Sequence, residues 1–566
     1  MEEYPWVKNY DDGVPPTLQP YPARTMVDIL DESARTRPYR AFIYFPGGRI
    51  LYEDFVKISD ALAAAFVDIG IVRNDRVILL LPNCPQMLLG LFAIWKAGAI
   101  AVPINPYHTE HELKLIFNEV QAAAVITLTT LYAAVKNIQS ETAVKTIIVT
   151  ETDEYVTPFT RFIKSVFGNR EAAGFSGLED GDYLFHRLAR KYGRRQRPGI
   201  QISPSDPAVI LFSGGMTGVP VGAVGTHQAI VMSALQIQAW LRPVLEEWDD
   251  RFLLPLPLYH DFGCVGALGT ALVNHSSCIL IPDPRNMTEV VKSIGKYRPA
   301  FMPAVSTFLV NMMRHPLITS GKVSCESIKV CVSGAIPLRP DLRRQFEKLI
   351  GGRLIEGYAM TETMQAAALL PVIRPAREGS VGLPLPDVVM RIMDGETGLI
   401  EMKPGQLGEV CVKAPNLMQG YWNRPEETAG VLRDGWLYTG DIGYMDEDGF
   451  LYIHSRKKEI IKTSGFQVWP REIEEVLQEH PDVMEVGVAG IPDPCQGESI
   501  KAWVVLSSDA SCDAEDLRDF CRSKLAAYKV PRYIEIRDKL PRSPVGKILR
   551  RVLIEQEQGG NFNDRK

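Results

Sequence analysis

Alternating strand and helix patterns run through the first 150 residues of the chain. Short apolar runs, which are typical of strands buried in a parallel sheet, lie at 76–82 (RVILLLP), 124–127 (AVIT) and 146–150 (TIIVT). Segments with the helical spacing of apolar residues separate them, at 86–97 and 110–122. This order of elements predicts a layered α/β domain.

The pattern changes toward the C-terminus. Residues 436–454 predict a hairpin, because two β-rich runs are joined by the turn sequence DEDG. Beyond it, Pro470 begins a helix with one apolar face, and two strands and a second helix follow. A tail of roughly 110 residues is large enough to fold as an α+β domain of its own. We therefore expect an N-terminal domain over 1–455 and a C-terminal domain over 456–566.

Residues 151–205 interrupt the α/β pattern. Their apolar residues are irregularly spaced, and a basic run, HRLARKYGRRQR, follows at 186–197. A solvated surface insertion explains this composition. The alternative is a peripheral contact with an anionic membrane surface, made by basic residues beside the exposed aromatics of 159–167.

Composition and charge narrow the class of protein. Hydrophobic residues make up 46% of the 566 residues and charged residues 23%, as in soluble globular proteins. The net charge of −6 argues against nucleic acid as the main partner. The nine cysteines form no CxxC pair, which argues against a zinc cluster or a disulfide framework and fits a reducing compartment.

Targeting signals are absent from the sequence pattern. The N-terminus, MEEYPWVKNYDDG, has neither the basic nor the apolar region of a signal peptide. No uninterrupted apolar run reaches the roughly 18 residues of a spanning helix. We expect a cytoplasmic protein, with peripheral contact at the inner face of the membrane as the alternative.

Two segments in the middle of the chain carry residues suited to nucleotide chemistry. The glycine-rich run 213–222 (SGGMTGVPVG) follows an apolar strand, and its backbone N–H groups and hydroxyls suit an anion, although no Walker A lysine follows. A structural turn is the alternative. In 357–362 (GYAMTE), a tyrosine, a threonine and a glutamate combine a stacking surface, a phosphate donor and a magnesium ligand. The alternative there is a loop that caps a strand.

Two further candidates lie closer to the C-terminus. Asp441 ends the run GWLYTGD, and one carboxylate at the end of a strand can accept hydrogen bonds from both hydroxyls of a ribose. A turn cap is the commoner role of such an aspartate. Lys547 follows a loop rich in proline and glycine, LPRSPVG, which could carry it into a remote cleft. An exposed basic tail is the alternative.

The order and spacing of these motifs resemble the superfamily of adenylate-forming enzymes, which includes acyl-CoA synthetases, luciferases and peptide adenylation domains. The resemblance is strongest to medium- and long-chain fatty acyl-CoA synthetases and extends from about residue 25 to residue 552. It rests on nine ordered segments: SGGMTGVPVGAVGTH (213–227), PLYHDFG (257–263), SGAIP (333–337), GYAMTE (357–362), GEV (408–410), MQGYWNRPEET (418–428), GWLYTGD (435–441), SRKKEIIKTSGFQVWPREIE (455–474) and LPRSPVGK (540–547).

The resemblance implies an AMP-forming acid–thiol ligase. A carboxylic acid, expected to be a medium- or long-chain fatty acid, would react with ATP to give an acyl-adenylate and then with coenzyme A to give a thioester. Mg²⁺ would assist the first step, and a homodimer is compatible with the sequence. The large N-terminal α/β domain would bind the acid and ATP, and the small C-terminal domain would rotate about a hinge at Lys458.

The resemblance also assigns roles to single residues around ATP. Thr361 would contact the α-phosphate, Glu362 would bind the metal, and Lys547 would bridge the acid's carboxylate and the α-phosphate. The nucleotide would be bound through its outer phosphates, adenine and ribose by Ser213, Gly214, Gly215, Thr217, Gly218, Ser333, Gly334, Ala335, Gly357, Tyr358, Asp441 and Arg456.

The other two substrates would lie on either side of the nucleotide. Lys462, Ser464 and Gly465 match positions that line the coenzyme A entry, and Lys462 is a candidate catalytic residue. The wall of the acyl pocket would comprise His260, Phe262 and Gly263, and the nearby glycines of 263–269 would leave room for the acyl chain. No general base is required, because the acid is already ionised at neutral pH.

Three positions depart from the family pattern. Val221 occupies the place of a lysine in the phosphate loop, Met216 replaces a threonine, and Ala359 replaces a glycine. The lost lysine should weaken ATP or pyrophosphate binding more than the chemical step. Together with PLYHD, this loss also resembles fatty acyl-AMP ligases, which serve a carrier protein, whereas SRKKEIIKTSGFQVWP favours coenzyme A as the acceptor. A third interpretation is a non-catalytic nucleotide- or acyl-binding protein.

Overall fold

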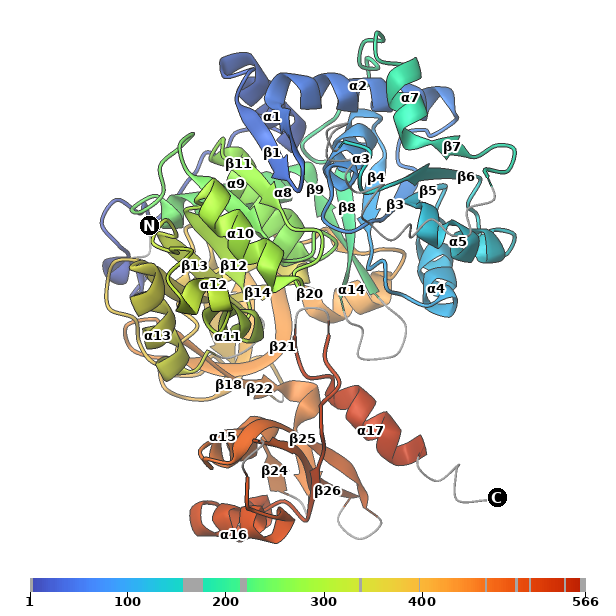
Figure 1. Ribbon diagram of the computed structural model, residues 1–566. Coiled ribbons are helices and arrows are strands. Elements are labelled where there is room, and N and C mark those ends of the chain that lie inside the picture. Colours follow the sequence, from blue (N-terminus) through green and yellow to red (C-terminus); the bar gives the residue numbers. More distant parts are fainter. Residues whose placement is uncertain are drawn as a thin grey trace.

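The computed structural model describes residues 4–155, 177–213, 221–334, 338–395, 397–463, 466–493, 497–507, 510–543 and 546–559. Figure 1 shows a large part, coloured blue through light orange, and a smaller orange-to-red part that lies below it. Within these ranges, the large part contains three sheets and the small part a fourth.

Two extended sheets form most of the large part. The nine-stranded sheet has the order β16 (Leu383–Pro384), β15 (Gln365–Leu369), β14 (Arg353–Met360), β13 (Val330–Ser333), β12 (Phe301–Ala304), β10 (Arg251–Leu254), β11 (Ser277–Leu280), β1 (Ala41–Phe45) and β2 (Gly48–Leu51). The eight-stranded sheet has the order β19 (Gly420–Tyr421), β9 (Val221–Thr226), β8 (Pro207–Ser213), β4 (Ile100–Pro103), β3 (Arg76–Leu80), β5 (Ala124–Leu128), β6 (Thr146–Thr150) and β7 (Tyr183–Leu184).

Helices cover these sheets and fill the space between them. Helix α8 contacts strands of both sheets, and its apolar residues belong to the core that the two sheets share. The helices of the large part are α1 (Met26–Thr36), α2 (Tyr52–Asp68), α3 (Pro85–Lys96), α4 (Glu110–Val120), α5 (Tyr132–Gln139), α7 (Phe185–Lys191), α8 (His227–Leu241), α9 (Thr270–Val273), α10 (Met287–Tyr297), α11 (Ser306–Met313), α12 (Pro316–Thr319), α13 (Pro340–Ile350) and α14 (Pro425–Val431).

Two smaller sheets lie closer to the C-terminus. The first contains β17 (Val389–Met393), β18 (Gly408–Lys413), β21 (Trp436–Met445) and β20 (Leu432–Arg433), with β22 (Leu451–Arg456) paired to β21. The second contains β24 (Phe466–Val468), β23 (Ile461–Thr463), β26 (Gly497–Leu506) and β25 (Val483–Asp493), with β27 (Tyr533–Ile536) paired to β26. This second sheet packs with α15 (Pro470–Gln478) and α16 (Ala514–Lys524) around its own core, and α17 (Arg550–Gly559) contacts β25.

The predicted α/β organisation is confirmed in the described residues. The apolar runs form the parallel strands β3, β5 and β6, the helical patterns form α3 and α4, and 436–454 forms the β21–β22 hairpin. Strands β23 and β24 and helix α17 escaped the prediction, because three-residue strands and a polar terminal helix give little periodic signal.

The basic run 186–197 is only partly a solvated surface. Leu188 and Tyr192 are buried, and helix α7 packs on α2. Arg197 forms ion pairs with Asp31 and Asp60 at 2.7 and 2.8 Å. The run therefore anchors a structural element, while the irregularly spaced apolar residues Phe159, Phe162, Val166 and Phe167 lie outside the described residues.

Candidate active site

The predicted nucleotide residues gather where parallel strands of the nine-stranded sheet end. Strands β12, β13 and β14 run parallel, and Ser333 is the last residue of β13. Gly357 and Tyr358 lie one and two residues beyond the parallel pairing of β14. His260 and Phe262 follow β10 at the same edge. Open α/β sheets bind ligands at this edge, so the fold itself brings these five residues together.

A hydrogen-bonded cluster connects this edge with the β21–β22 hairpin. The Tyr358 hydroxyl donates to one Asp441 carboxylate oxygen at 2.6 Å, and Arg456 Nε lies 2.7 Å from the other. Asp441 and Arg456 are also paired across the hairpin. Burial, followed by the Asp441 charge, raises the pKa of Tyr358, so its hydroxyl stays a donor. We call these three residues the nucleotide cluster.

Glu362 lies close by, in the 3₁₀ turn η4 (Thr361–Thr363) that follows β14. Its side chain is buried, and its carboxylate accepts a hydrogen bond from the Tyr421 hydroxyl at 2.7 Å. Burial raises the pKa of Glu362, the Tyr421 hydrogen bond and the Arg456 charge oppose the rise, and the Asp261 charge adds to it. A buried carboxylate with a second carboxylate nearby favours a bound cation.

The backbone after Glu362 is strained. Met364 and Gln365 have φ values of 46° and 98°, in the region that only glycine enters without cost. Two hydrogen bonds of Thr363 hold this backbone in place. The Thr363 hydroxyl donates to the Met360 carbonyl, and the Asn416 side-chain amide donates to the Thr363 carbonyl at 2.7 Å. The rigid turn fixes the direction of the Glu362 side chain.

Lys547 reaches the nucleotide cluster from the small part of the molecule. It remains solvent-exposed, yet it lies close enough for the charges of Arg456 and Asp441 to act on it. Loss of hydration among these groups, followed by the Arg456 charge, lowers the pKa of its ammonium. Among the residues that the structure describes, the Lys547 ammonium has no hydrogen bond or ion pair. It is thus available to an anion.

Glu409 connects the nucleotide cluster with the predicted hinge, and sequence reasoning did not single it out. One of its carboxylate oxygens accepts a hydrogen bond from the Gly440 N–H at 3.0 Å, next to Asp441. The other lies 2.8 Å from Lys457 Nζ, in the 3₁₀ turn η5 (Lys457–Glu459). Glu409 is buried, so this bridge ties the start of the hinge to the ribose side of the site.

The predicted acyl-pocket residues lie in and before a π-helical segment, η3 (Phe262–Gly269). His260 Nδ1 lies 2.5 Å from the buried Asp261 carboxylate. Burial acts to raise the pKa of Asp261, but the His260 charge outweighs it and the pKa falls below its usual range. Phe262 lies beside Gly334, at the end of β13.

The glycines of this segment do not leave the room that the sequence predicted. A Cβ at Gly263 would lie 2.1 Å from the Pro257 carbonyl oxygen, and one at Gly266 would lie 2.6 Å from the Gln365 side chain. These glycines allow neighbouring protein atoms to approach the helix closely. Space for an acyl chain beside Gly266 would require the Gln365 side chain to move.

Other predicted site residues lie apart from this cluster or outside the described residues. Lys462 is exposed in β23, where its N–H donates to Glu498 at 2.6 Å, and no described contact joins it to the nucleotide cluster. The side chains of Ser213 and Lys458 are not described. The remaining predicted residues lie outside the described ranges: Gly214, Gly215, Thr217, Gly218, Ala335, Ser464 and Gly465.

Sequence comparisons give a consistent picture. Residues 30–422 match the model of the AMP-binding enzyme family, and residues 472–547 match that of the AMP-binding enzyme C-terminal domain. The chain is 37% identical to a long-chain-fatty-acid–CoA ligase of Bacillus subtilis, over 98% of this chain and 99% of the relative. It is 33% identical to the enzyme of the same name from Escherichia coli O6:H1, over 98% of both chains.

Solved structures agree in fold. The ATP-bound structure of MatB from Rhodopseudomonas palustris has a TM-score of 0.82 and 26% sequence identity, over 95% of this chain and 99% of MatB. Its apo structure has a TM-score of 0.70 over the same shares. The family model covers more than half of the chain, and curated relatives match nearly all of it. The predicted resemblance is confirmed, and the chain belongs to the AMP-binding enzyme family.

Proposed function

We propose that this chain is an ATP-dependent ligase that joins a long-chain fatty acid to coenzyme A through an acyl-adenylate. The observation that carries the proposal is the Lys547 ammonium, which has no partner in the described part of the chain and lies beside the nucleotide cluster. A cation there can bind both an acid and a phosphate. The long-chain-fatty-acid–CoA ligases of Bacillus subtilis and Escherichia coli, which match nearly all of the chain, indicate the class of acid and the acceptor.

In the first half-reaction, the fatty acid carboxylate attacks the α-phosphorus of ATP. An oxygen–phosphorus bond forms, the bond to the departing pyrophosphate breaks, and the electron pair leaves with pyrophosphate. Two anions must approach each other, so a cation between them lowers the barrier where repulsion is largest. We assign this role to Lys547, because its side chain lies near both Asp441 and Arg456 of the nucleotide cluster.

The nucleotide cluster would hold ATP in place for this attack. We assign the ribose hydroxyls to Asp441 and the support of that carboxylate to Arg456, because the pair is already oriented by the hairpin. The buried Ser333 hydroxyl has no partner among the described residues, which fits a polar ligand at the end of β13. Gly334, Gly357 and Tyr358 would complete the adenine surface.

Mg²⁺ fits the residues around Glu362. The buried Glu362 carboxylate offers the hard oxygen ligand that Mg²⁺ prefers. Asp261, which is paired with His260, adds negative charge nearby. When bound, Mg²⁺ would neutralise charge on the ATP phosphates. Thr361, beside Glu362 in η4, would contact the α-phosphate.

In the second half-reaction, the thiol of coenzyme A attacks the acyl carbon of the adenylate. A carbon–sulfur bond forms, the bond to AMP breaks, and the thiol proton passes to solvent. We propose that a domain over 456–566 rotates about Lys458 for this step, bringing Lys462, Ser464 and Gly465 toward the thiol. The higher TM-score of ATP-bound than of apo MatB supports the present arrangement as the adenylating one.

We further propose that the enzyme meets its apolar substrate by peripheral contact at the membrane, and that it forms a homodimer. None of the helices in the described ranges has the length and hydrophobicity needed to cross a bilayer. Long-chain acids partition into membranes, so a surface contact would shorten the route of the acid to the site. Flotation with anionic and neutral vesicles tests the first idea, and sedimentation tests the second.

The activity is tested with a panel of acids, ATP and Mg²⁺, with and without coenzyme A. We expect pyrophosphate release to depend on a long-chain acid and the thioester to form when coenzyme A is present. Accumulation of acyl-AMP alone in the presence of coenzyme A would instead identify an acyl-AMP ligase. Absence of acid-dependent pyrophosphate release across the panel would contradict the ligase altogether.

A further inference from the structure

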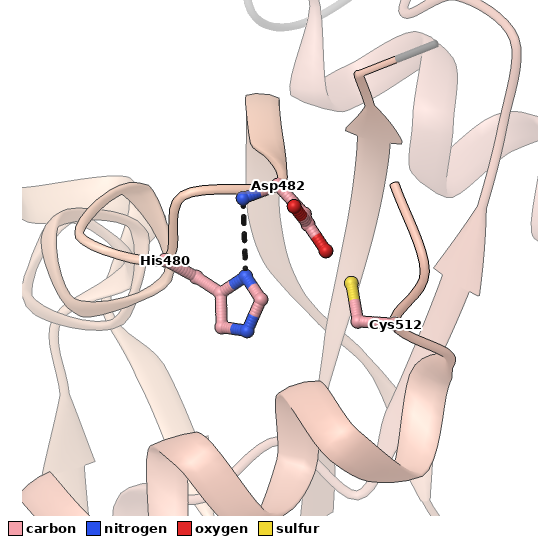
Figure 2. A group of neighbouring side chains, drawn as sticks. All are labelled: His480, Asp482 and Cys512. Atoms are coloured by element: carbon pink, nitrogen blue, oxygen red, sulfur yellow. Dashed lines mark hydrogen bonds between the residues drawn. The ribbon is translucent and has the colours of Figure 1, made fainter. Parts of the chain in front are cut away.

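A group of side chains with metal-ligating atoms lies in the small part of the molecule, beside the sheet that contains β25. His480 follows α15, Asp482 precedes β25, and Cys512 precedes α16. One ligating atom from each residue lies within 4.8 Å of the other two. Figure 2 shows the imidazole, carboxylate and thiol converging from these three segments. We call them the His–Asp–Cys group.

The scaffold around the group is well ordered by hydrogen bonds. The Asp482 N–H donates to His480 Nδ1 at 3.3 Å, as Figure 2 also shows. The Ser507 N–H donates to the Asp482 carbonyl at 2.8 Å, and the Ser511 N–H reaches the Asp482 carboxylate at 3.3 Å. The His480 ring packs edge-on against Phe520, with centroids 5.0 Å apart. The three side chains are thus held in place while each remains half-buried.

The charge balance at the group favours a cation. Within the described part of the chain, Asp482 is hydrogen-bonded to the Ser511 N–H and has no ion pair with a lysine or arginine. The Asp516 carboxylate adds negative charge close to the Cys512 thiol. The Cys512 thiol lies beside the Asp482 carboxylate, with the His480 ring as the third neighbour. Three ligating atoms from different segments thus share one small region that a cation could occupy.

We propose that His480, Asp482 and Cys512 form a binding site for Zn²⁺. Nitrogen, carboxylate oxygen and thiolate sulfur together are the ligand set of zinc and suit neither Mg²⁺ nor Ca²⁺, which prefer oxygen alone. Tetrahedral zinc separates its ligand atoms by roughly 3.5 Å, and the three atoms lie within 4.8 Å of one another, so small side-chain movements would bring them to zinc. Water would occupy the fourth position. The Cys512 sulfur–hydrogen bond breaks, a sulfur–zinc bond forms, and the proton passes to solvent.

This site escaped the sequence analysis for a definable reason. The missing CxxC pair argued against a zinc cluster, but Cys512 lies 30 residues beyond Asp482 and meets it only through the fold. The ion would tie the segment before α16 to the turn between α15 and β25. It would stabilise the small domain and take no part in the chemistry at Lys547.

The first experiment measures Zn²⁺ binding to the metal-stripped full-length protein in competition with a chromophoric chelator. We expect one equivalent to bind, and affinity to fall at least ~10-fold in C512S, H480A and D482N, since even groups behind metal ligands contribute that much. H111A removes an exposed histidine of α4 and serves as the matched control, with unchanged affinity. Equal affinity of C512S and the unaltered protein would overturn the proposal.

The second experiment measures protection of the thiol in a C495S background, because Cys495 lies outside the described residues. The other described cysteines are buried, so iodoacetamide should label Cys512 first. We expect Zn²⁺, but not Mg²⁺, to protect Cys512, as located by peptide mass. Labelling unaffected by Zn²⁺ would overturn the proposal. Both readouts are independent of ligase activity and therefore of the proposed function.

Discussion

The nucleotide cluster and the Lys547 loop meet at the same site but are held in different ways. Tyr358, Asp441 and Arg456 bind one another through short contacts, and Asp441 is buried. Lys547 is exposed, its ammonium has no partner among the described residues, and it comes from the small part of the molecule. The first region has the features of a fixed binding surface and the second those of a group that enters and leaves.

Replacing Lys547 gives the sharpest test of this comparison. We expect Lys547→Ala to lower the adenylation rate at least ~100-fold, because the variant loses the cation that we place between the acid's carboxylate and the α-phosphate. Thermal stability should stay unchanged, since the side chain is exposed. The rate is measured by acid-dependent pyrophosphate exchange.

Two controls separate the half-reactions. Thioester formation from synthetic acyl-AMP should survive in Lys547→Ala, because that step does not need the ammonium at the phosphate. Lys539→Ala removes an exposed lysine of the same segment and should leave both rates unchanged. An equal loss of both half-reactions in Lys547→Ala would mean that Lys547 is part of the fixed surface.

Asp441→Asn tests the fixed surface. The amide retains the shape of the carboxylate but leaves Arg456 without its counter-charge and weakens the bonds to the ribose. We expect KM for ATP to rise ~10- to 100-fold, the scale of one or two hydrogen bonds to a charged group. Tyr358→Phe, which removes one hydrogen bond to Asp441, should have a smaller effect. An unchanged KM for ATP would contradict the assignment of Asp441 to the ribose hydroxyls.

Tyr421→Phe examines the metal side of the site. Tyr421 lowers the pKa of Glu362 by its hydrogen bond, so its removal should raise that pKa further. The carboxylate form then needs a higher pH, and the acidic limb of the pH–rate profile should move upward. We expect about tenfold more Mg²⁺ for half-maximal rate. Tyr438→Phe, which loses only a 3.4 Å contact, is the control; identical profiles would contradict the assignment.

Val221→Lys should produce the smallest effect. Val221 begins β9 and pairs with Ser213, at the base of the predicted phosphate loop. One added charge near the outer phosphates is worth about 1 kcal/mol in a solvated site, so KM for ATP should fall about fivefold. Val221→Met provides the length without the charge. Equal ATP affinity in both variants would contradict our explanation of this departure from the family pattern.

Much of the fold was predictable because its buried strands are continuous apolar runs in the sequence. Strand β3 is five residues long and its last four are fully buried, which requires a continuous apolar run. The sequence also singled out Asp441 and Lys547, since each lies in a motif with family-specific order, and their roles stay predictions. These signals depend only on residues next to one another in the chain.

The remaining parts of the site depend on contacts between distant segments. Tyr421 reaches Glu362 across 59 positions, and Glu409 reaches Lys457 across 48. The packing of Gln365 against Gly266 follows from a π-helix and a strained turn that the sequence pattern does not reveal. Such contacts arise from the register of strands and the path of turns, and no local pattern encodes them.

The bridge made by Glu409 has a consequence for the order of events. It anchors Lys457 one residue ahead of the proposed pivot, and its other oxygen binds the backbone beside Asp441. Rotation at Lys458 would therefore leave the segment up to Lys457 in place while everything beyond it swings. The nucleotide site would keep its shape while the small domain rotates. The acyl-adenylate would therefore stay bound until coenzyme A reaches it.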